Sequence, residues 1–226
     1  MPVVVHVSPH PDDEALGAPA TLLLLRRAGW RVVNAVLSLG RPDDEARRRA
    51  EAVDAAERAG FTLVLRDASR IDDWLMSLLH EHAPAIVLAP SPHDGHPGHE
   101  AVGRATGAAL AAMAAPPVWW QWGLWADLTA PTIYVPFDDD VLGEAQHVLT
   151  AYAGELARND YLRLLEARAI AHAVLGSERV FGFGSTRAST LPYAELLTEL
   201  VRGESEWNPG TTRLLDPAAP LGRVSR

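Results

Sequence analysis

The sequence predicts an α/β protein with a mainly parallel sheet and helices on both faces of that sheet. Short apolar runs, typical of buried parallel strands, alternate along the chain with longer segments of helical periodicity. The 226 residues suit one domain and are enough to bury a core. Apolar residues make up 48% and charged residues 22% of the chain, as in ordinary folded proteins.

Six segments are expected to form strands, because each is a short apolar or β-rich run next to turn-forming residues. In chain order they are residues 3–7, 31–39, 61–65, 85–89, 118–124 and 132–137. The first and fourth are continuous apolar runs, which favours the centre of the sheet.

Seven segments have the periodicity and the boundary residues of helices. They are residues 14–27, 42–58, 72–82, 99–115, 141–157, 159–174 and 191–202. From Gly203 onward Gly, Pro, Ser and Thr dominate. We therefore expect one domain over residues 1–202 and a tail, 203–226, that packs on its surface.

Composition argues against several functional classes. The formal charge is −9 and basic residues are not clustered, so nucleic-acid binding is not expected. We find no pattern of a signal peptide and no apolar stretch near the ~18 residues that a membrane span needs, so a cytoplasmic protein without a membrane partner is expected. The chain has no cysteine, so any metal site must use imidazole and carboxylate groups.

Two packets of such groups follow strand-like runs. His10-Pro11-Asp12-Asp13-Glu14 follows residues 3–7, and a second packet from His93 to His99 follows residues 85–89. Right-handed crossovers bring the loops that follow parallel strands to one edge of the sheet. The two packets are therefore expected to converge there and to form a site.

The packets contain the residues of a hydrolytic metal site. His10, Asp13 and His99 would hold a zinc ion and leave it an open coordination position, where a water could be activated. Asp12 would act as general base, and His96, if protonated, would stabilise an oxyanion. The alternative is that Asp12 and Asp13 cap a helix near unrelated surface histidines.

Two more acidic residues are candidates for supporting roles. Asp94 is expected to hydrogen-bond an imidazole and to set its tautomer, as carboxylates behind metal ligands do. Glu14 is expected to favour the N-terminus of its helix or to brace a ligand.

The two packets resemble the signature motifs of the PIG-L/LmbE-like deacetylases. That family has (P/A)HPDDE after its first strand and an HPDH-type motif after a later strand. The first motif matches completely, whereas Gly98 stands where the second motif usually has Asp. Arg48-Arg49-Ala50-Glu51 is similar to the family's R-x-x-E helix, and Tyr193-Ala194-Glu195 to its C-terminal YAE segment. Gly154-Glu155 departs from the Ser-Gln pair that is common in the family.

The resemblance implies a Rossmann-like fold and zinc-dependent hydrolysis of an N-acyl group. It assigns zinc to His10, Asp13 and His99, the base to Asp12 and oxyanion stabilisation to His96. Zinc is preferred on family grounds, although another divalent ion such as Fe²⁺ is compatible with the ligands.

The resemblance also indicates substrate contacts. It places Arg48 against the substrate and gives Asp67 the position of a sugar-binding carboxylate. The alternative for each is a surface ion pair, which contributes little to stability.

Four tryptophans crowd residues 119–125. Aromatic faces can stack on sugars at a substrate rim, and they can equally fill the core or an oligomer interface. The sequence leaves these three roles open, and with them a homo-oligomer.

The predicted function is that of a metal-dependent N-deacetylase acting on a small-molecule amino-sugar conjugate of the N-acetylglucosamine (GlcNAc) type, releasing acetate and a free amine. One alternative is an amidase that removes a larger N-acyl group from a thiol-cofactor or natural-product conjugate. A second is a metal-binding or interaction module without turnover.

Overall fold

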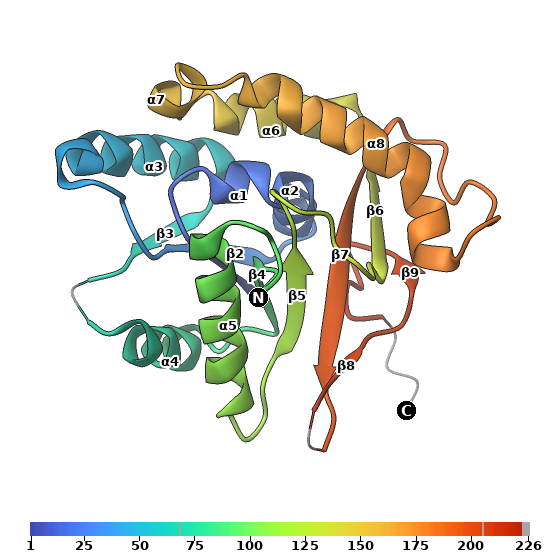
Figure 1. Ribbon diagram of the computed structural model, residues 1–226, viewed down its shortest axis with the longest axis horizontal. Coiled ribbons are helices and arrows are strands. Elements are labelled where there is room, and N and C mark those ends of the chain that lie inside the picture. Colours follow the sequence, from blue (N-terminus) through green and yellow to red (C-terminus); the bar gives the residue numbers. More distant parts are fainter. Residues whose placement is uncertain (68, 205, 223–226) are drawn as a thin grey trace.

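The computed structural model describes residues 1–67, 69–204 and 206–222, and it contains a mixed, mostly parallel sheet with helices on both faces in a single domain (Figure 1). The predicted fold class is therefore confirmed. The strands are β1 (Val3–Ser8), β2 (Arg31–Val36), β3 (Thr62–Leu65), β4 (Ile86–Pro90), β5 (Val118–Trp122), β6 (Ile133–Phe137), β7 (Tyr193–Arg202), β8 (Trp207–Pro209) and β9 (Arg213–Leu214).

The strand order is β3-β2-β1-β4-β5-β7-β6-β9, with β8 paired to β7. Strands β1 to β5 run parallel to one another, and β7 runs antiparallel between β5 and β6. The helices are α1 (Asp13–Leu16), α2 (Pro19–Arg27), the 3-10 helix η1 (Pro42–Asp44), α3 (Glu45–Ala59), α4 (Ile71–His82), α5 (Pro97–Ala111), α6 (Asp139–Leu149), α7 (Ala153–Leu156) and α8 (Tyr161–Phe181).

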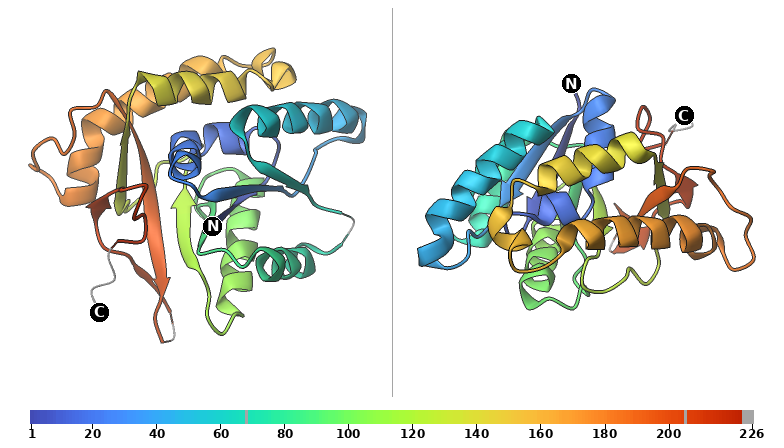
Figure 2. Two further views of the ribbon diagram at one scale, coloured as in Figure 1. Left: turned by 180° about the vertical axis from the view of Figure 1, so that it is seen from behind. Right: turned by 90° about the horizontal axis from the view of Figure 1, so that it is seen from above.

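Different helices cover the two faces of the sheet, as the views in Figure 2 show. Along β1, Val3, Val5 and Val7 pack in the cluster that contains α4 and α5, whereas Val4 packs in the cluster that contains α2. Because successive side chains of a strand point to opposite faces, an apolar run buries both faces at once.

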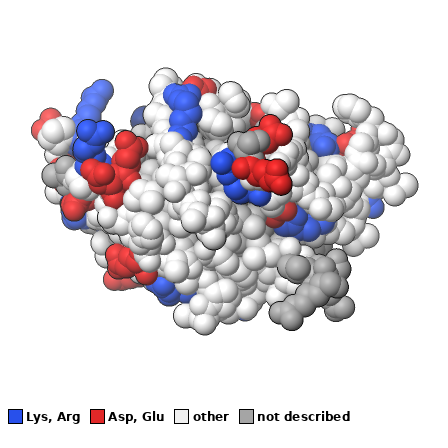
Figure 3. Space-filling model, turned by 90° about the horizontal axis from the view of Figure 1, so that it is seen from below, with Lys and Arg blue, Asp and Glu red and all other residues white. Residues whose placement is uncertain are grey.

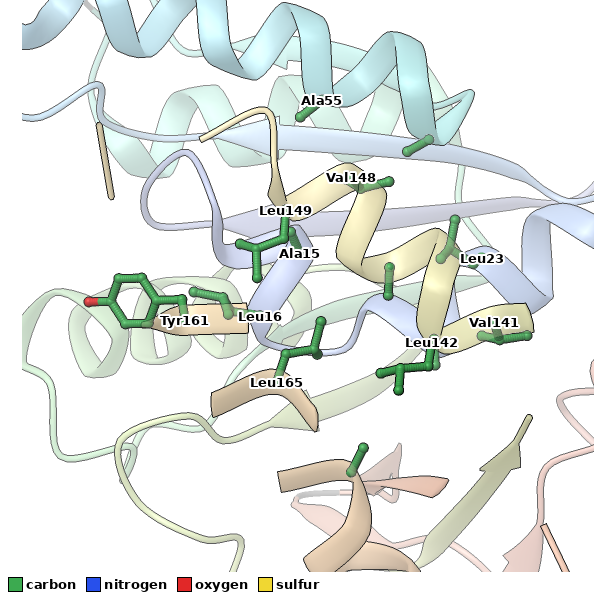
Figure 4. Close-up of a cluster of buried hydrophobic side chains, with 14 of the residues drawn as sticks. Ala15, Leu16, Leu23, Ala55, Val141, Leu142, Val148, Leu149, Tyr161 and Leu165 are labelled. Atoms are coloured by element: carbon green, nitrogen blue, oxygen red, sulfur yellow. The ribbon is translucent and has the colours of Figure 1, made fainter. Parts of the chain in front are cut away.

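A third hydrophobic cluster fixes the short helix α1, which carries Asp13. Ala15 and Leu16 of α1 pack among side chains of α6 and α8, including Leu149 and Leu165 (Figure 4). The outer layer of α6 and α8 therefore buries the start of the first helical segment, and with it the loop that follows β1.

Residues 191–202 are predicted as a helix, but strand β7 (Tyr193–Arg202) occupies most of this segment, so that prediction is wrong. Two acidic residues of β7 are buried acceptors, not parts of a solvent-facing helix. Glu195 accepts hydrogen bonds from the backbone amides of Ala20 and Thr21, and Glu199 accepts one from the indole of Trp120. These partners lie far away in the sequence, so the local pattern did not reveal the strand.

Other boundaries differ in smaller ways. Residues 14–27 form two helices, because the chain turns at Gly17 and Pro19 starts α2. A Cβ atom on Gly17 would lie 2.7 Å from the Trp122 ring, so the close approach to β5 needs glycine there. Residues 42–58 and 141–157 are also each divided in two, and α8 continues to residue 181.

The segment after Gly203 adds two short strands to the sheet. β8 pairs with β7, β9 pairs with β6, and Leu215 is buried in a core cluster. The domain boundary expected at residue 203 stays a prediction.

The face seen in Figure 3 is largely uncharged, with small groups of acidic and basic side chains interspersed. Within the described parts of the chain, none of the helices combines the length and the hydropathy that a bilayer span requires.

Candidate metal centre

The two histidine-containing packets meet at the carboxyl ends of β1 and β4, which are parallel neighbours in the sheet. The first packet leads into α1 and the second into α5. Both line a cavity of about 570 Å³. The cavity wall consists of His10, Asp12, Asp13, Leu16, Gly40, Arg41, Asp44, Arg47, Arg48, His96, His99, Leu124, Trp125, Gly154, Glu155, Arg158 and Tyr161.

Three side chains at the floor of the cavity form a candidate metal centre. His10, Asp13 and His99 each offer one ligand atom, and these atoms all lie within 4.8 Å of one another. Asp13 Oδ1 is 3.2 Å from His99 Nε2, and Asp13 Oδ2 is 3.5 Å from His10 Nδ1. The carboxylate is held in place because its Oδ2 also accepts the backbone N–H of His10 at 2.7 Å.

The electrostatics of this centre favour a cation. Burial by itself would raise the pKa of Asp13, but its contacts with the two imidazoles hold it well below the ordinary value. Burial opposes the charge of His99, yet Asp13 and Asp94 raise its pKa to about 9. Two imidazoles and a carboxylate around one point, in surroundings that favour positive charge, fit a divalent ion of the zinc type.

Asp94 stands behind His99, on the side away from Asp13. Its Oδ2 lies 2.9 Å from His99 Nδ1, and the residue is fully buried. A proton on Nδ1 leaves the lone pair of Nε2 directed at Asp13 and the centre. The role expected of Asp94 from the sequence stays a prediction.

Asp12 lies beside the centre without joining it. Its backbone has a φ of 100°, in the left-handed region that residues with a side chain rarely adopt. The side chain is buried and lines the cavity, and in the described residues its carboxyl group caps no helix. Burial, followed by the charges of Asp13, Glu14 and Glu155, raises the pKa of Asp12 well above its ordinary value. This carboxyl group is therefore suited to hold a proton.

His96 forms the N-cap of α5 and faces the same cavity. Its Nδ1 accepts the backbone N–H of His99 at 3.4 Å, and its ring centre lies 4.7 Å from that of His99. Burial and the neighbouring imidazoles of His99 and His10 lower its pKa. The neutral form is thus favoured over the protonated form considered from the sequence, and Nε2–H is the available donor.

Gly98, which departs from the family motif, lies in contact with these imidazoles. A Cβ atom there would approach Cε1 of His96 to 3.1 Å and Cε1 of His10 to 3.3 Å. The glycine therefore lets the two histidine-containing turns pack closely.

Glu14 is buried, but it does not line the cavity. Its Oε1 accepts a hydrogen bond from the hydroxyl of Tyr152, and burial raises its pKa to about 7. It connects α1 to the α6–α7 junction, so its contact supports the position of α1.

Arg48 lines the cavity and donates to Glu155, with its Nε at 3.1 Å. Glu155 is buried and also pairs with Arg158 at 2.7 Å. Nothing in the local sequence pattern around Glu155 indicates that it meets Arg48, 107 residues away.

Asp67 is not brought to the cavity. It is exposed and accepts hydrogen bonds from the backbone and the hydroxyl of Ser69, which lower its pKa. Its contacts are with a residue two positions along the chain.

The four tryptophans divide between two environments. Trp119, Trp120 and Trp122 are buried, whereas Trp125 is 57% exposed and lines the cavity. The sequence had left the core and the rim open for all four.

Comparison with known proteins agrees with the motifs. Residues 5–110 match the family PIG-L, described as GlcNAc-PI de-N-acetylase. A probable N-acetyl-alpha-D-glucosaminyl L-malate deacetylase 2 of Bacillus cereus is 31% identical over 135 residues, which are 49% of this chain and 61% of that protein. Diacetylchitobiose deacetylase of Thermococcus kodakarensis is 30% identical over 122 residues, 44% of this chain and 46% of its own length. The matched regions thus span less than two thirds of these relatives.

The same fold occurs in a protein of another activity. The 4-carboxy-2-hydroxymuconate hydratase GalB of Pseudomonas putida superposes with a TM-score of 0.69 at 19% identity, over 91% of this chain and 99% of that one. The fold alone therefore does not specify the reaction. The likeness to the PIG-L family lies instead in the matched sequence of residues 5–110, which includes both histidine motifs and makes up somewhat less than half of this chain.

Proposed function

We propose that this protein hydrolyses the N-acetyl amide of a GlcNAc-type conjugate and releases acetate and a free amine. The observation that carries the proposal is a buried, uncoordinated carboxyl group, Asp12, beside a triad that suits a divalent ion. A protein that only binds metal has no need of such a group.

His10, Asp13 and His99 would hold the ion, which we take to be zinc. When bound, it would polarise the amide carbonyl and make water a stronger nucleophile near neutral pH. Asp12 accepts a proton from the attacking water and returns it to the nitrogen as the C–N bond breaks. The Nε2–H of His96 donates to the carbonyl oxygen as negative charge develops on it.

The substrate class follows from the relatives. The two curated relatives are named for substrates that contain N-acetylated glucosamine, joined to L-malate in one and to a second such sugar in the other. A cavity of about 570 Å³ is within the range of small-molecule sites and has room for a sugar conjugate.

An acidic group on the conjugate is favoured by the arginines of the cavity wall. Arg47, Arg48 and Arg158 pair with carboxylates, whereas Arg41 has no ion pair among the residues that the structure describes. Its guanidinium would be available to a carboxylate or phosphate of the substrate.

The test combines metal analysis with product analysis. The purified protein, loaded with zinc, is incubated with GlcNAc conjugates and with analogues of longer acyl groups, and acetate and amine are quantified. Equimolar release of both from acetyl substrates supports the proposal. Release of amine only from the analogues with longer acyl groups would indicate an amidase for larger N-acyl groups. Bound zinc without any turnover would indicate a metal-binding module that is not an enzyme.

Variants separate the proposed roles. Asp12→Asn should keep its zinc and lose about 10²–10⁴-fold in kcat, whereas His99→Ala should lose zinc. Asp72→Asn, an exposed acid on α4, is the matched control and should change neither property. Hydrolysis by Asp12→Asn at the wild-type rate would reject the assigned base.

A further inference from the structure

We propose that Trp125 is the platform on which the pyranose ring of the substrate stacks, and that Arg168 is a positioning residue for it. This inference rests on the proposed function, because it concerns how the same cavity takes a sugar.

Trp125 differs from the other tryptophans of its segment. Its neighbours Trp119, Trp120 and Trp122 are at most 4% exposed, while Trp125 is 57% exposed. An indole left this open in a cavity wall presents apolar surface that a ligand can cover.

The indole lies one ring away from the candidate metal centre. Its plane is 26° from that of His96, with ring centres 5.8 Å apart, and His96 is itself 4.7 Å from His99. A ring seated on Trp125 would therefore lie next to the groups assigned to the amide. In a GlcNAc unit the amide is attached directly to the ring, which matches this spacing.

The loop that carries Trp125 is held from two sides. On one side, Oδ1 of Asp94 accepts the backbone N–H groups of Leu124 at 2.6 Å and of Trp125 at 3.3 Å. On the other side, Arg168 of α8 donates to the carbonyl oxygens of Leu124 at 2.8 Å and of Gly123 at 2.5 Å. Loops are usually the mobile parts of a protein, whereas these four hydrogen bonds hold this loop in one position.

Arg168 is committed to this loop. Within the described chain it forms no ion pair, and its hydrogen bonds go to the two carbonyl groups. Placing a guanidinium in a partly buried site only to hold backbone carbonyls has an energetic cost, and the result is a fixed position for the exposed ring of Trp125. Gly123 allows the loop to fold tightly, because a Cβ atom there would lie 2.4 Å from the carbonyl oxygen of Ala126.

The chemistry of a pyranose fits such a platform. One face of the ring presents mainly C–H groups, which pack on an aromatic face, while its hydroxyl groups point outward to polar partners. A two-carbon acetyl group needs no surface of this size. The remaining candidate, a long acyl chain, is distinguished by the experiment.

The experiment measures kcat and KM of the zinc-loaded protein on a GlcNAc conjugate and on N-acetylethanolamine, an acetamide without a sugar. Trp125→Ala should raise KM for the sugar about tenfold, with kcat within about threefold and zinc content unchanged. KM of Trp125→Phe for the sugar should lie between those of Trp125→Ala and the wild type. KM for N-acetylethanolamine should not change in either variant. Trp207→Ala, outside the cavity, is the matched control.

Arg168 is tested through its coupling to Trp125. Arg168→Gln should raise KM for the sugar, as Trp125→Ala does. Arg168→Lys should raise KM less than Arg168→Gln. Added to Trp125→Ala, Arg168→Gln should have little further effect, because its contribution acts through the indole. A full second increase in KM would show that Arg168 acts independently and would overturn its role.

Binding keeps the inference testable without turnover. Titration of methyl N-acetylglucosaminide into wild type and Trp125→Ala should show about tenfold weaker binding by the variant. If the wild type does not hydrolyse the amide but shows this difference, the proposed function fails and the platform stands. Equal binding and equal KM overturn the platform, as does an effect of Trp125→Ala that is confined to long-chain acyl substrates.

Discussion

Truncation of Glu195 is expected to destabilise the fold strongly. This buried carboxylate of β7 accepts the backbone N–H of Ala20 at 2.7 Å, the N–H of Thr21 at 2.8 Å and the hydroxyl of Thr21 at 2.6 Å. It thus caps the first turn of α2 from a strand about 175 residues away.

The magnitude follows from these bonds. Glu195→Ala leaves two buried N–H groups without acceptors, at about 1–3 kcal/mol each, and removes a negative charge from the helix N-terminus, worth about 0.3–1 kcal/mol. Relief from burying the carboxylate offsets part of the loss. We expect a net decrease of about 3 kcal/mol in the free energy of unfolding, with about half of that for Glu195→Gln, which keeps one acceptor oxygen.

The assay is urea unfolding followed by circular dichroism, with thermal melts in parallel. For a chain of this length, 3 kcal/mol corresponds to a decrease in Tm of about 6–12 °C. Glu166→Ala, an exposed acid on α8, is the control and should stay within about 0.5 kcal/mol of wild type. If Glu195→Ala loses no more stability than this control, the carboxylate does not cap α2 and the reasoning is wrong.

Three further predictions concern packing, metal and pH. Gly17→Ala should lower the free energy of unfolding by about 1–3 kcal/mol, because its Cβ atom would lie 2.7 Å from the Trp122 ring. Gly143→Ala in α6 should raise the free energy of unfolding by about 0.5–1 kcal/mol, because no atom lies within 4 Å of the added Cβ. Urea unfolding measures both changes. Chelation of zinc should lower the Tm of the wild type, because a metal bound to the native state stabilises it, and should leave the Tm of His99→Ala unchanged. Equal Tm shifts of the two proteins in calorimetry would count against His99 as a zinc ligand. Burial lowers the pKa of His6 and of His172 from 6.5 to about 4 in the folded protein. Below pH 6.5 the unfolded chain therefore binds more protons than the folded chain, so the free energy of unfolding should fall as the pH decreases from 6.5 to 4, less steeply in His172→Asn. A free energy of unfolding that stays constant over that range would contradict this prediction.

The sequence predicted the convergence of the two histidine-containing packets because parallel neighbouring strands end at one edge of the sheet. Apolar runs at residues 3–7 and 85–89 were enough to place both packets there. Their ligand atoms indeed lie within 4.8 Å of one another.

What the sequence did not predict depends on partners that are distant along the chain. Residues 191–202 are predicted as a helix from the sequence, whereas the acids of β7, Glu195 and Glu199, contact partners near residues 20, 120 and 213 in the structure. Glu155 and Arg168 act on groups 107 and 44 residues away. No local pattern carries this information. Asp67 shows the reverse case, since its hydrogen bonds go to Ser69, two positions along the chain.

The wall of the cavity is assembled from two parts of the chain. The candidate ligands and Asp12 lie within residues 5–110, which match the family, whereas Trp125, Glu155, Arg158 and Tyr161 come from the stretch beyond that match. The proposed cleavage residues and the proposed sugar platform therefore lie in separate stretches of the chain, and transplanting residues 123–161 between homologues would show whether that stretch alters substrate selectivity.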